Sequence, residues 1–152
     1  MVALSHDARA SYKALGTLVG ASPATVRRRL QRLLGDGAYT ARCEVSRRIS
    51  GSPIEVTVWL EAPSTTVAVT GALLAELDQA RLCAAVVGGS NLVLVAWLRS
   101  LGELQALEIE IARIAPSANV VKRAVTLRHL KLITRVLDDE LAGRVVPADI
   151  WG

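Results

Sequence analysis

The chain has 152 residues, of which 51% are hydrophobic and 21% charged, as in one ordinary folded domain or two very small ones. No apolar stretch approaches the roughly 20 residues that a membrane span needs, so we expect no membrane contact. The charge is uneven: residues 1–48 contain nine Lys and Arg against three acids, and the rest contain nine against eleven. A basic head on a mildly acidic body suggests a polyanion as the partner of the head.

The two cysteines, Cys43 and Cys83, lie far apart and outside any CxxC or CxxH pattern. We therefore expect no metal ion and no other cofactor, but two reduced thiols of the kind found in cytoplasmic proteins. The first seven residues lack the basic segment and long apolar run of a signal peptide, which also favours a cytoplasmic location.

Residues 8–19 are predicted to form a first helix, because their apolar positions recur at helical spacing. Gly20 is a good stop for this helix. Ser22 is a strong N-cap and Pro23 suits the first position of a second helix, which we expect to reach about Leu34. Two short helices joined by a glycine-containing turn are typical of a helix-turn-helix.

The second predicted helix has an apolar face and a basic face. The apolar face comprises Val26, Leu30, Leu33 and Leu34. Arginine on the other side offers bidentate donors for guanine and charge for phosphate, and the N–H groups at the helix start suit a phosphate oxygen. A solvated basic face without nucleic acid is the weaker alternative. We expect contacts with double-stranded DNA from Ser22, Thr25, Arg27, Arg28, Arg29 and Arg32.

After a short strand over 38–46 and a polar connection, the predicted elements alternate in type. The expected strands are 54–60, 82–87, 92–98 and one within 119–132, and the expected helices run from Pro63 to about Leu77 and, capped by Ser100, to Ile114. The order β-α-β-β-α-β is the split βαβ, or ferredoxin-like, arrangement, with both helices on one face of an antiparallel sheet. The strands are too apolar for a bare second face, which favours burial against another copy of the chain.

A tight turn with two glycines precedes the strand 92–98. A glycine pair lets the backbone approach a ligand closely, and the next two residues add a hydroxyl and an amide. This turn is a candidate site for the carboxylate and ammonium of a small zwitterion, with the ammonium held by the side-chain oxygen of Asn91. A plain hairpin turn is the alternative. The candidate residues are Gly88, Gly89, Ser90 and Asn91.

Two other functions are disfavoured. An RNA-recognition module needs exposed aromatic residues on its strands, and this chain has no Phe and only Trp59 and Trp97 there. An enzyme needs a catalytic constellation, but neither His6 nor His129 has a convincing acid or nucleophile beside it, so no catalytic residue is assigned.

The two halves together resemble the leucine-responsive/asparagine (Lrp/AsnC, or feast/famine) family of regulators. The resemblance lies in residues 15–37 (LGTLVGASPATVRRRLQRLLGDG), 86–98 (VVGGSNLVLVAWL) and 122–132 (KRAVTLRHLKL). It implies a winged helix-turn-helix followed by a ferredoxin-like βαββαβ sensor domain. It also implies dimers formed through the sheet, octamers formed from dimers, and an amino-acid-like effector bound between dimers near the glycine turn.

The chain departs from the family at two places. The family usually has an acid at the position of Asn91, and it has a full helix before the segment that matches Leu4–Arg9, inside which this chain begins.

We therefore expect an α+β chain with a partial winged helix-turn-helix domain over 1–48, whose first helix is truncated. A ligand-sensing and oligomerisation domain over 53–134 and a C-terminal extension over 135–152 are expected to follow. The expected function is that of a homodimeric or larger DNA-binding transcriptional regulator, modulated by a small amino-acid-like effector. The alternative is a stand-alone sensor and oligomerisation module with a non-functional DNA-binding head.

Overall fold

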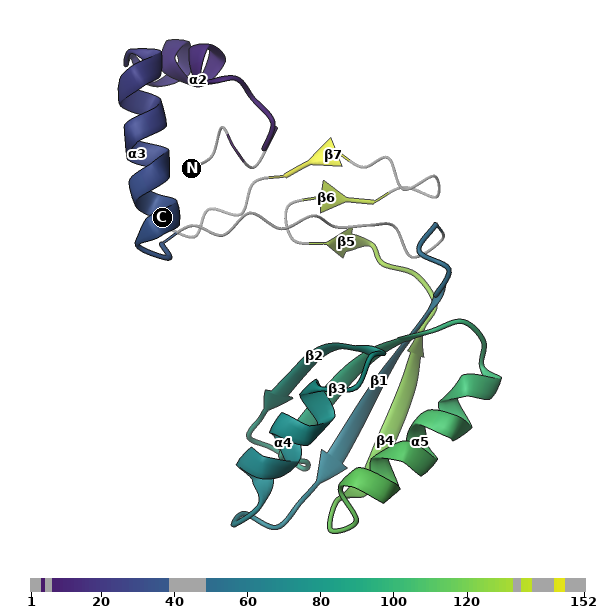
Figure 1. The fold of residues 1–152 in the computed structure, drawn as a ribbon. Coiled ribbons are helices and arrows are strands. Elements are labelled where there is room, and N and C mark those ends of the chain that lie inside the picture. The colour runs from purple at the N-terminus through teal and green to yellow at the C-terminus, as the bar shows by residue number, and fades with distance from the viewer. Residues whose placement is uncertain (1–3, 5–6, 39–48, 133–134, 138–143, 147–152) are drawn as a thin grey trace. The chain divides into compact units, whose positions relative to one another are not determined.

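The computed structural model describes residue 4 and residues 7–38, 49–132, 135–137 and 144–146 (Figure 1). Contacts divide the chain into two compact units, residues 1–44 with 129–152 and residues 45–128. The domain limits given above stay a prediction. The elements are α2 (Tyr12–Val19), α3 (Pro23–Gly35), β1 (Ile54–Glu61), α4 (Val67–Ala75), β2 (Ala80–Ala85), β3 (Leu92–Leu98), α5 (Gly102–Ile114), β4 (Asn119–Thr126), β5 (Lys131–Leu132), β6 (Arg135–Val136) and β7 (Arg144–Val145).

Helix α2 begins at Tyr12, so the predicted start at residue 8 is wrong. The reason is local, because Ser11 is the N-cap and its Oγ accepts a hydrogen bond from the Ala14 N–H at 3.2 Å. The helix ends as predicted at Gly20, which has a φ of 64° and donates its N–H to the carbonyl of Gly16.

Helix α3 is confirmed with its predicted cap. Ser22 Oγ accepts from the Thr25 N–H at 3.2 Å, and Pro23 occupies the first helical position. Val26 is buried, but Leu34 is 50% exposed, so Leu34 does not belong to the apolar face. Leu34 follows Leu33 directly in the helix. One residue step rotates the side chain by about 100° around the helix axis, which takes Leu34 off the face that Leu30 and Leu33 share.

Strands β5, β6 and β7 form a second, three-stranded antiparallel sheet in the order β5-β6-β7. Each has only two residues, too few for an alternating pattern to be recognised in the sequence. The last strand of the larger sheet, expected within 119–132, ends at Thr126. The strand and wing expected around 38–46 lie, from residue 39 onward, outside the described residues.

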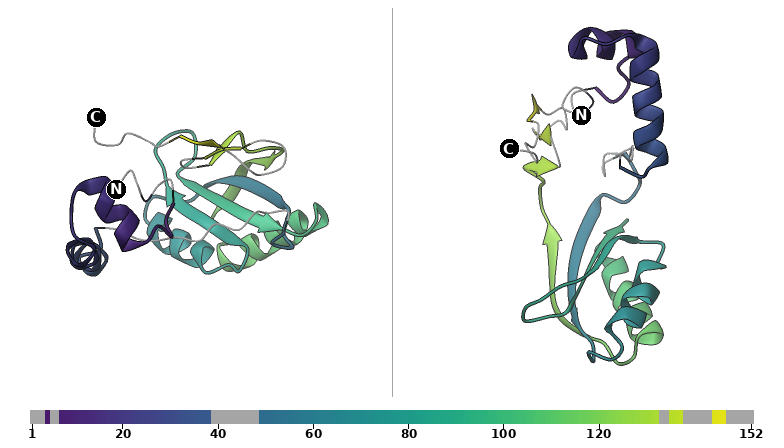
Figure 2. Two further views of the ribbon diagram at one scale, coloured as in Figure 1. Left: turned by 90° about the horizontal axis from the view of Figure 1, so that it is seen from above. Right: turned by 90° about the vertical axis from the view of Figure 1, so that its left-hand side faces the viewer.

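The larger sheet confirms the ferredoxin-like prediction. Its order is β2-β3-β1-β4, and every neighbouring pair is antiparallel. Helices α4 and α5 lie on the same face of the sheet, as the view from above shows (Figure 2). None of the helices in the described part of the chain is long and apolar enough to cross a membrane.

The core of this unit lies between the sheet and its two helices. Along β1 and β3 every second side chain is buried, which is the alternation of a sheet covered on one face. Helix α4 contributes Leu74, and α5 contributes Leu107 and Ile111. The fully buried strand residues are Val56, Val58, Leu60, Leu92, Leu94, Ala96 and Leu98.

Both helix starts in this unit were predicted too early. Residues 63–66 form a turn, in which Thr66 donates its N–H and its hydroxyl to the carbonyl of Pro63, at 2.8 and 3.1 Å, so α4 begins at Val67. Helix α5 begins at Gly102, and the Ser100 side chain does not cap it.

Strand β2 also differs from its prediction, because it ends at Ala85 rather than at residue 87.

Candidate nucleic-acid interface and ligand site

The turn between α2 and α3 is closed by a contact that only glycine permits. A Cβ atom built on Gly16 would lie 2.5 Å from the carbonyl oxygen of Ala21. The Ala21 N–H donates to the carbonyl of Gly16 at 3.0 Å, so the backbone of the turn rests directly on α2. Leu15 of α2 and Val26 of α3 are the buried apolar residues of this pair. The glycine therefore fixes the angle at which α3 leaves the turn.

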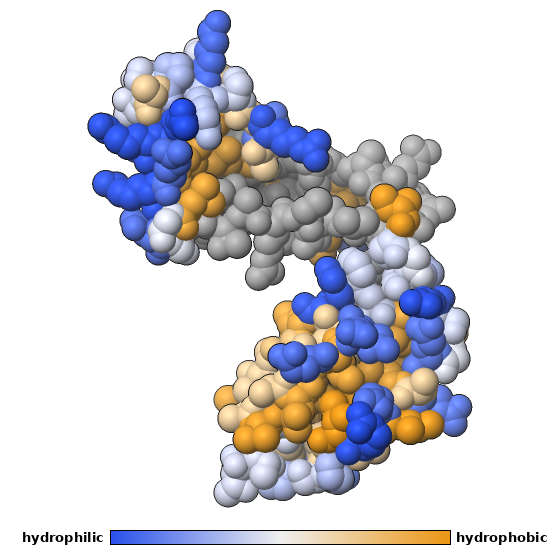
Figure 3. Space-filling view, in the orientation of Figure 1, coloured by the Kyte–Doolittle hydropathy of each residue, from blue (hydrophilic) through white to orange (hydrophobic). Residues whose placement is uncertain are grey.

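The arginines predicted to read DNA are all exposed on α3. Figure 3 shows hydrophilic side chains gathered along this helix. Arg28, Arg29 and Arg32 line one hollow of about 370 Å³, whereas Arg27 is not part of this lining. None of the four forms an ion pair within the described residues. Their charges are therefore available to an external anion.

Ser22 and Thr25 have local partners at the start of α3. The Ser22 hydroxyl caps the helix and also lies 2.9 Å from Thr25 Oγ1. The Val26 N–H donates to the Ser22 carbonyl at 3.0 Å, and Pro23 has no N–H. The Ala24 N–H makes no hydrogen bond within the described part, so it is the amide of this first turn left for a phosphate oxygen.

The sheet face that α4 and α5 do not cover is apolar across its middle. Residues paired across the strands share a face, and one row runs Leu82, Val95, Thr57, Ala124. The neighbouring row runs Ala84, Val93, Trp59, Lys122. This open sheet face matches the surface expected to be buried by a second copy.

One end of the open sheet face is held by polar contacts. The Glu55 carboxylate accepts from Trp97 Nε1 at 3.0 Å and from the Thr126 hydroxyl at 2.9 Å. The Arg81 guanidinium lies over the Trp97 ring at 4.2 Å, and the Lys122 ammonium lies 5.0 Å from the Trp59 ring centre. Both indole rings therefore lie against a cationic side chain of the chain itself.

The predicted turn joins β2 and β3 as a hairpin. The Val86 N–H donates to the Asn91 carbonyl at 3.0 Å and closes it. Gly88 and Gly89 are exposed. Within the described part of the chain, the N–H groups of Gly88, Gly89 and Ser90 donate no hydrogen bond. Three adjacent free amides of this kind suit a carboxylate.

Asn91 is bonded to the chain segment that follows β1. Its Oδ1 accepts from the Ala62 N–H at 3.0 Å, and its Nδ2 donates to the Ala62 carbonyl at 2.7 Å. The Asn91 N–H also donates to the Leu60 carbonyl at 3.1 Å. The side-chain oxygen that the sequence suggested for an ammonium group therefore has a partner in the chain.

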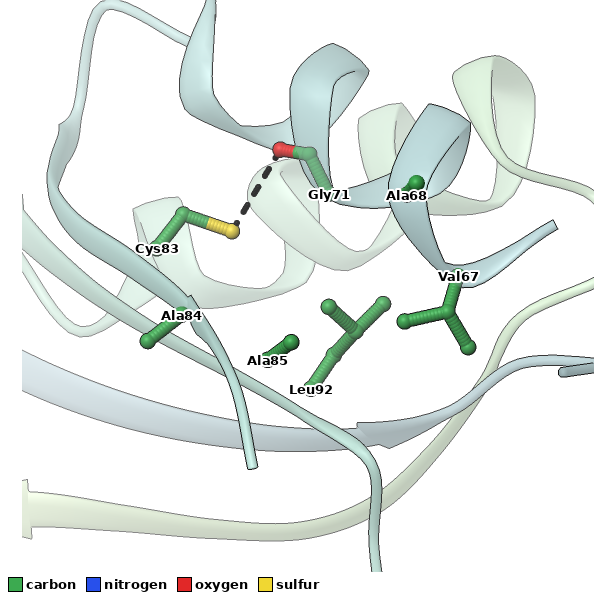
Figure 4. A pocket seen from close by; sticks show the side chains of 7 residues that line it. All are labelled: Val67, Ala68, Gly71, Cys83, Ala84, Ala85 and Leu92. Atoms are coloured by element: carbon green, nitrogen blue, oxygen red, sulfur yellow. Dashed lines mark hydrogen bonds between the residues drawn. The ribbon is translucent and has the colours of Figure 1, made fainter. Parts of the chain in front are cut away.

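An apolar hollow of about 190 Å³ lies beside the base of this turn (Figure 4). Its lining comes from α4, β2 and the first residue of β3: Val67, Ala68, Gly71, Cys83, Ala84, Ala85 and Leu92. The Cys83 thiol donates to the Gly71 carbonyl at 3.4 Å, and burial raises the pKa of this thiol. Sequence reasoning missed the hollow, although small residues recur on both α4 and β2.

The part of the chain that the structure describes contains no group of three His, Cys, Asp or Glu residues arranged to hold a metal ion.

Comparison with known proteins bears on both units. The AsnC-type helix-turn-helix domain matches residues 1–34. No curated protein sequence matches the chain.

Several solved structures share the fold over most of the chain. The structure of E. coli AsnC is 23% identical, covers 86% of this chain and 89% of its own, and gives a TM-score of 0.75. A feast or famine regulatory protein from M. tuberculosis, complexed with L-methionine, is 23% identical, with 86% and 88% covered and a TM-score of 0.74. B. subtilis LrpC is 23% identical, with 85% and 90% covered and a TM-score of 0.69. The predicted resemblance to Lrp/AsnC regulators is confirmed in its fold and in the type of its N-terminal domain.

Proposed function

We propose that this chain, which shares its fold with Lrp/AsnC regulators and begins with an AsnC-type helix-turn-helix, is a DNA-binding transcriptional regulator of the cytoplasm. The observation that carries the proposal is the row of exposed arginines on α3, the second helix of the helix-turn-helix. Such a helix enters the major groove with its N-terminal part against the base edges. A helix that served only to pack would not need this concentration of unpaired charge.

The positions of the side chains on α3 indicate which of them would contact base edges and which would contact phosphates. Arg28, Arg29 and Arg32 surround one hollow and would reach guanine edges or phosphates together. Arg27 lies outside this group and would contact a flanking phosphate. Ser22 and Thr25 would act mainly through the cap that orients the helix, with the Ala24 amide beside them for a phosphate.

The experiment that tests the proposal measures binding of the full chain to labelled duplex DNA by fluorescence anisotropy. The double variant Arg28→Gln/Arg32→Gln should bind at least about tenfold more weakly, since each lost contact is worth about 1–3 kcal/mol. The matched control Arg99→Gln/Arg113→Gln removes the same charge from exposed positions of the other unit. Equal affinity of the two double variants would contradict DNA binding through α3.

We infer that the chain assembles into dimers through the open sheet face. Its middle rows are apolar, and aliphatic side chains on a sheet face without helices are stabilised when another surface covers them. A second copy offers the same surface and would close a symmetric pair. Helix α4 adds a separate exposed apolar surface around Val69 and Leu73, which supports association beyond the dimer.

An effector would bind at the turn between β2 and β3. The free amides of Gly88, Gly89 and Ser90 would hold its carboxylate, and the adjacent apolar hollow would take a short aliphatic side chain. The complex of the M. tuberculosis relative with L-methionine supports an amino acid as the ligand class. Asn91 would contribute by fixing the turn rather than by binding the ammonium group.

A further inference from the structure

A polar hollow of about 350 Å³ lies at the end of β3, which is the opposite end from the turn that precedes this strand. This volume falls in the range of small-molecule sites, about 300–1,000 Å³. Its lining is Ser52, Asp78, Gln79, Trp97, Arg99 and Glu103. The residues come from the segment before β1, the connection from α4 to β2, the end of β3 and the start of α5.

Hydrogen bonds hold the walls of this hollow in place. The Trp97 N–H donates to the Gln79 carbonyl at 2.9 Å, which ties the α4–β2 connection to β3. The Trp97 indole is fixed by Glu55 at its nitrogen and by the Arg81 guanidinium over its ring. The Arg99 N–H donates to Glu103 Oε2 at 2.9 Å. The Trp97 ring and the backbone around the hollow are therefore ordered and lose little conformational entropy when a ligand binds.

One basic and one acidic side chain of the hollow, Arg99 and Asp78, form no ion pair within the described part of the chain. With Glu103, the lining has two acidic side chains and one basic side chain. An unpaired guanidinium prefers a carboxylate, which it can hold bidentately, and an unpaired carboxylate prefers an ammonium or a guanidinium.

We propose that this hollow is a binding site for a small zwitterion with one additional positive charge, the chemistry of a basic amino acid. The ligand's carboxylate pairs with Arg99, and its cationic groups pair with Asp78 and Glu103. The indole of Trp97 packs against the ligand's aliphatic stem. The site is separate from the effector site at the glycine turn, because the two lie at opposite ends of β3.

The test is calorimetric titration of the full chain with L-arginine and with agmatine, the same molecule without its carboxylate. Arg99→Gln should weaken L-arginine binding about tenfold, because it removes the partner of the carboxylate. It should not weaken agmatine binding, because agmatine has no carboxylate and the substitution removes a like charge beside this dication. Asp78→Asn should weaken both ligands. Both positions are exposed, so the variants should keep the wild-type melting temperature.

Two comparisons complete the experiment. Arg113→Gln removes another exposed arginine, on α5 and outside the hollow, and should leave both affinities unchanged. Gly71→Ala narrows the apolar hollow by the turn and should also have no effect here. The proposal is overturned if the wild-type chain gives no heat with millimolar L-arginine. It is equally overturned if Arg99→Gln weakens both ligands alike, or if only Gly71→Ala weakens binding.

Discussion

Asn91 illustrates how one side chain can fix the geometry of a candidate site without touching the ligand. Both polar atoms of its amide bond to the main chain of Ala62, which is 5% exposed. The turn with the free amides is thereby tied to the segment between β1 and α4. A carboxylate at this position could accept the same N–H, but it could not donate to the Ala62 carbonyl.

We therefore expect Asn91→Asp to destabilise the chain by about 1–3 kcal/mol at neutral pH, since it leaves a buried carbonyl facing an anionic oxygen. The loss should diminish as the pH falls, because a protonated Asp can donate to that carbonyl. The control is Asn119→Asp at an exposed position, which should change stability by no more than about 0.5 kcal/mol. Thermal unfolding of both variants measures the two losses of stability. Identical melting curves would mean that the hydrogen bonds of the Asn91 side chain contribute nothing to stability.

Among the elements, the helix-turn-helix depends on Gly16 for the contact between α2 and the turn. Gly16→Ala should lower the free energy of unfolding by more than about 1 kcal/mol, because the backbone oxygen of Ala21 must move. It should also weaken DNA binding, since α3 leaves the turn at a different angle.

The matched control for this prediction is Gly35→Ala in the last turn of α3. A Cβ there meets open space, and alanine favours a helix by about 0.5–1 kcal/mol over glycine. Its melting temperature should therefore rise slightly. If both variants shifted the melting temperature in the same direction, the close contact at Gly16 would not be the cause.

The elements also show what the sequence could predict. Ser22, Pro23 and Gly20 act through local backbone chemistry, so the start of α3 and the end of α2 were predicted correctly. The alternation of apolar and polar residues identified β1, and the apolar run after the glycine turn identified β3. The start of α4 was placed too early because Pro63 and Ser64 are favoured both in a turn and at a helix start.

The sites depended on contacts that no local pattern records. The sequence identified the exposed arginines, but the hollow that gathers three of them depends on how their side chains lie on α3. It singled out Asn91, but the partner is Ala62, which is 29 residues away in the sequence. The two hollows of the sheet unit each combine residues from several elements, so only the folded chain brings them together.

At the scale of the whole molecule, we expect at least a dimer, formed through the open sheet face. Val95→Lys places a charge in the middle of this face and should convert the dimer to a monomer, because an unpaired charge in an apolar interface is costly. Ile109→Lys is the control. Ile109 is 64% exposed and belongs to α5, which covers the opposite face of the sheet. Light scattering at micromolar concentration gives the mass, and a wild-type monomer would show that the open sheet face forms no stable dimer.

DNA binding through α3 is tested most directly by the salt dependence of duplex DNA binding by the full chain. Each phosphate contact contributes about 0.9 to the slope of log affinity against log salt. We expect a steep slope for the wild-type chain. The slope should be shallower by at least about one unit for Arg28→Gln/Arg32→Gln and unchanged for Arg99→Gln/Arg113→Gln. If all three proteins had the same slope, α3 would not be the surface that meets DNA.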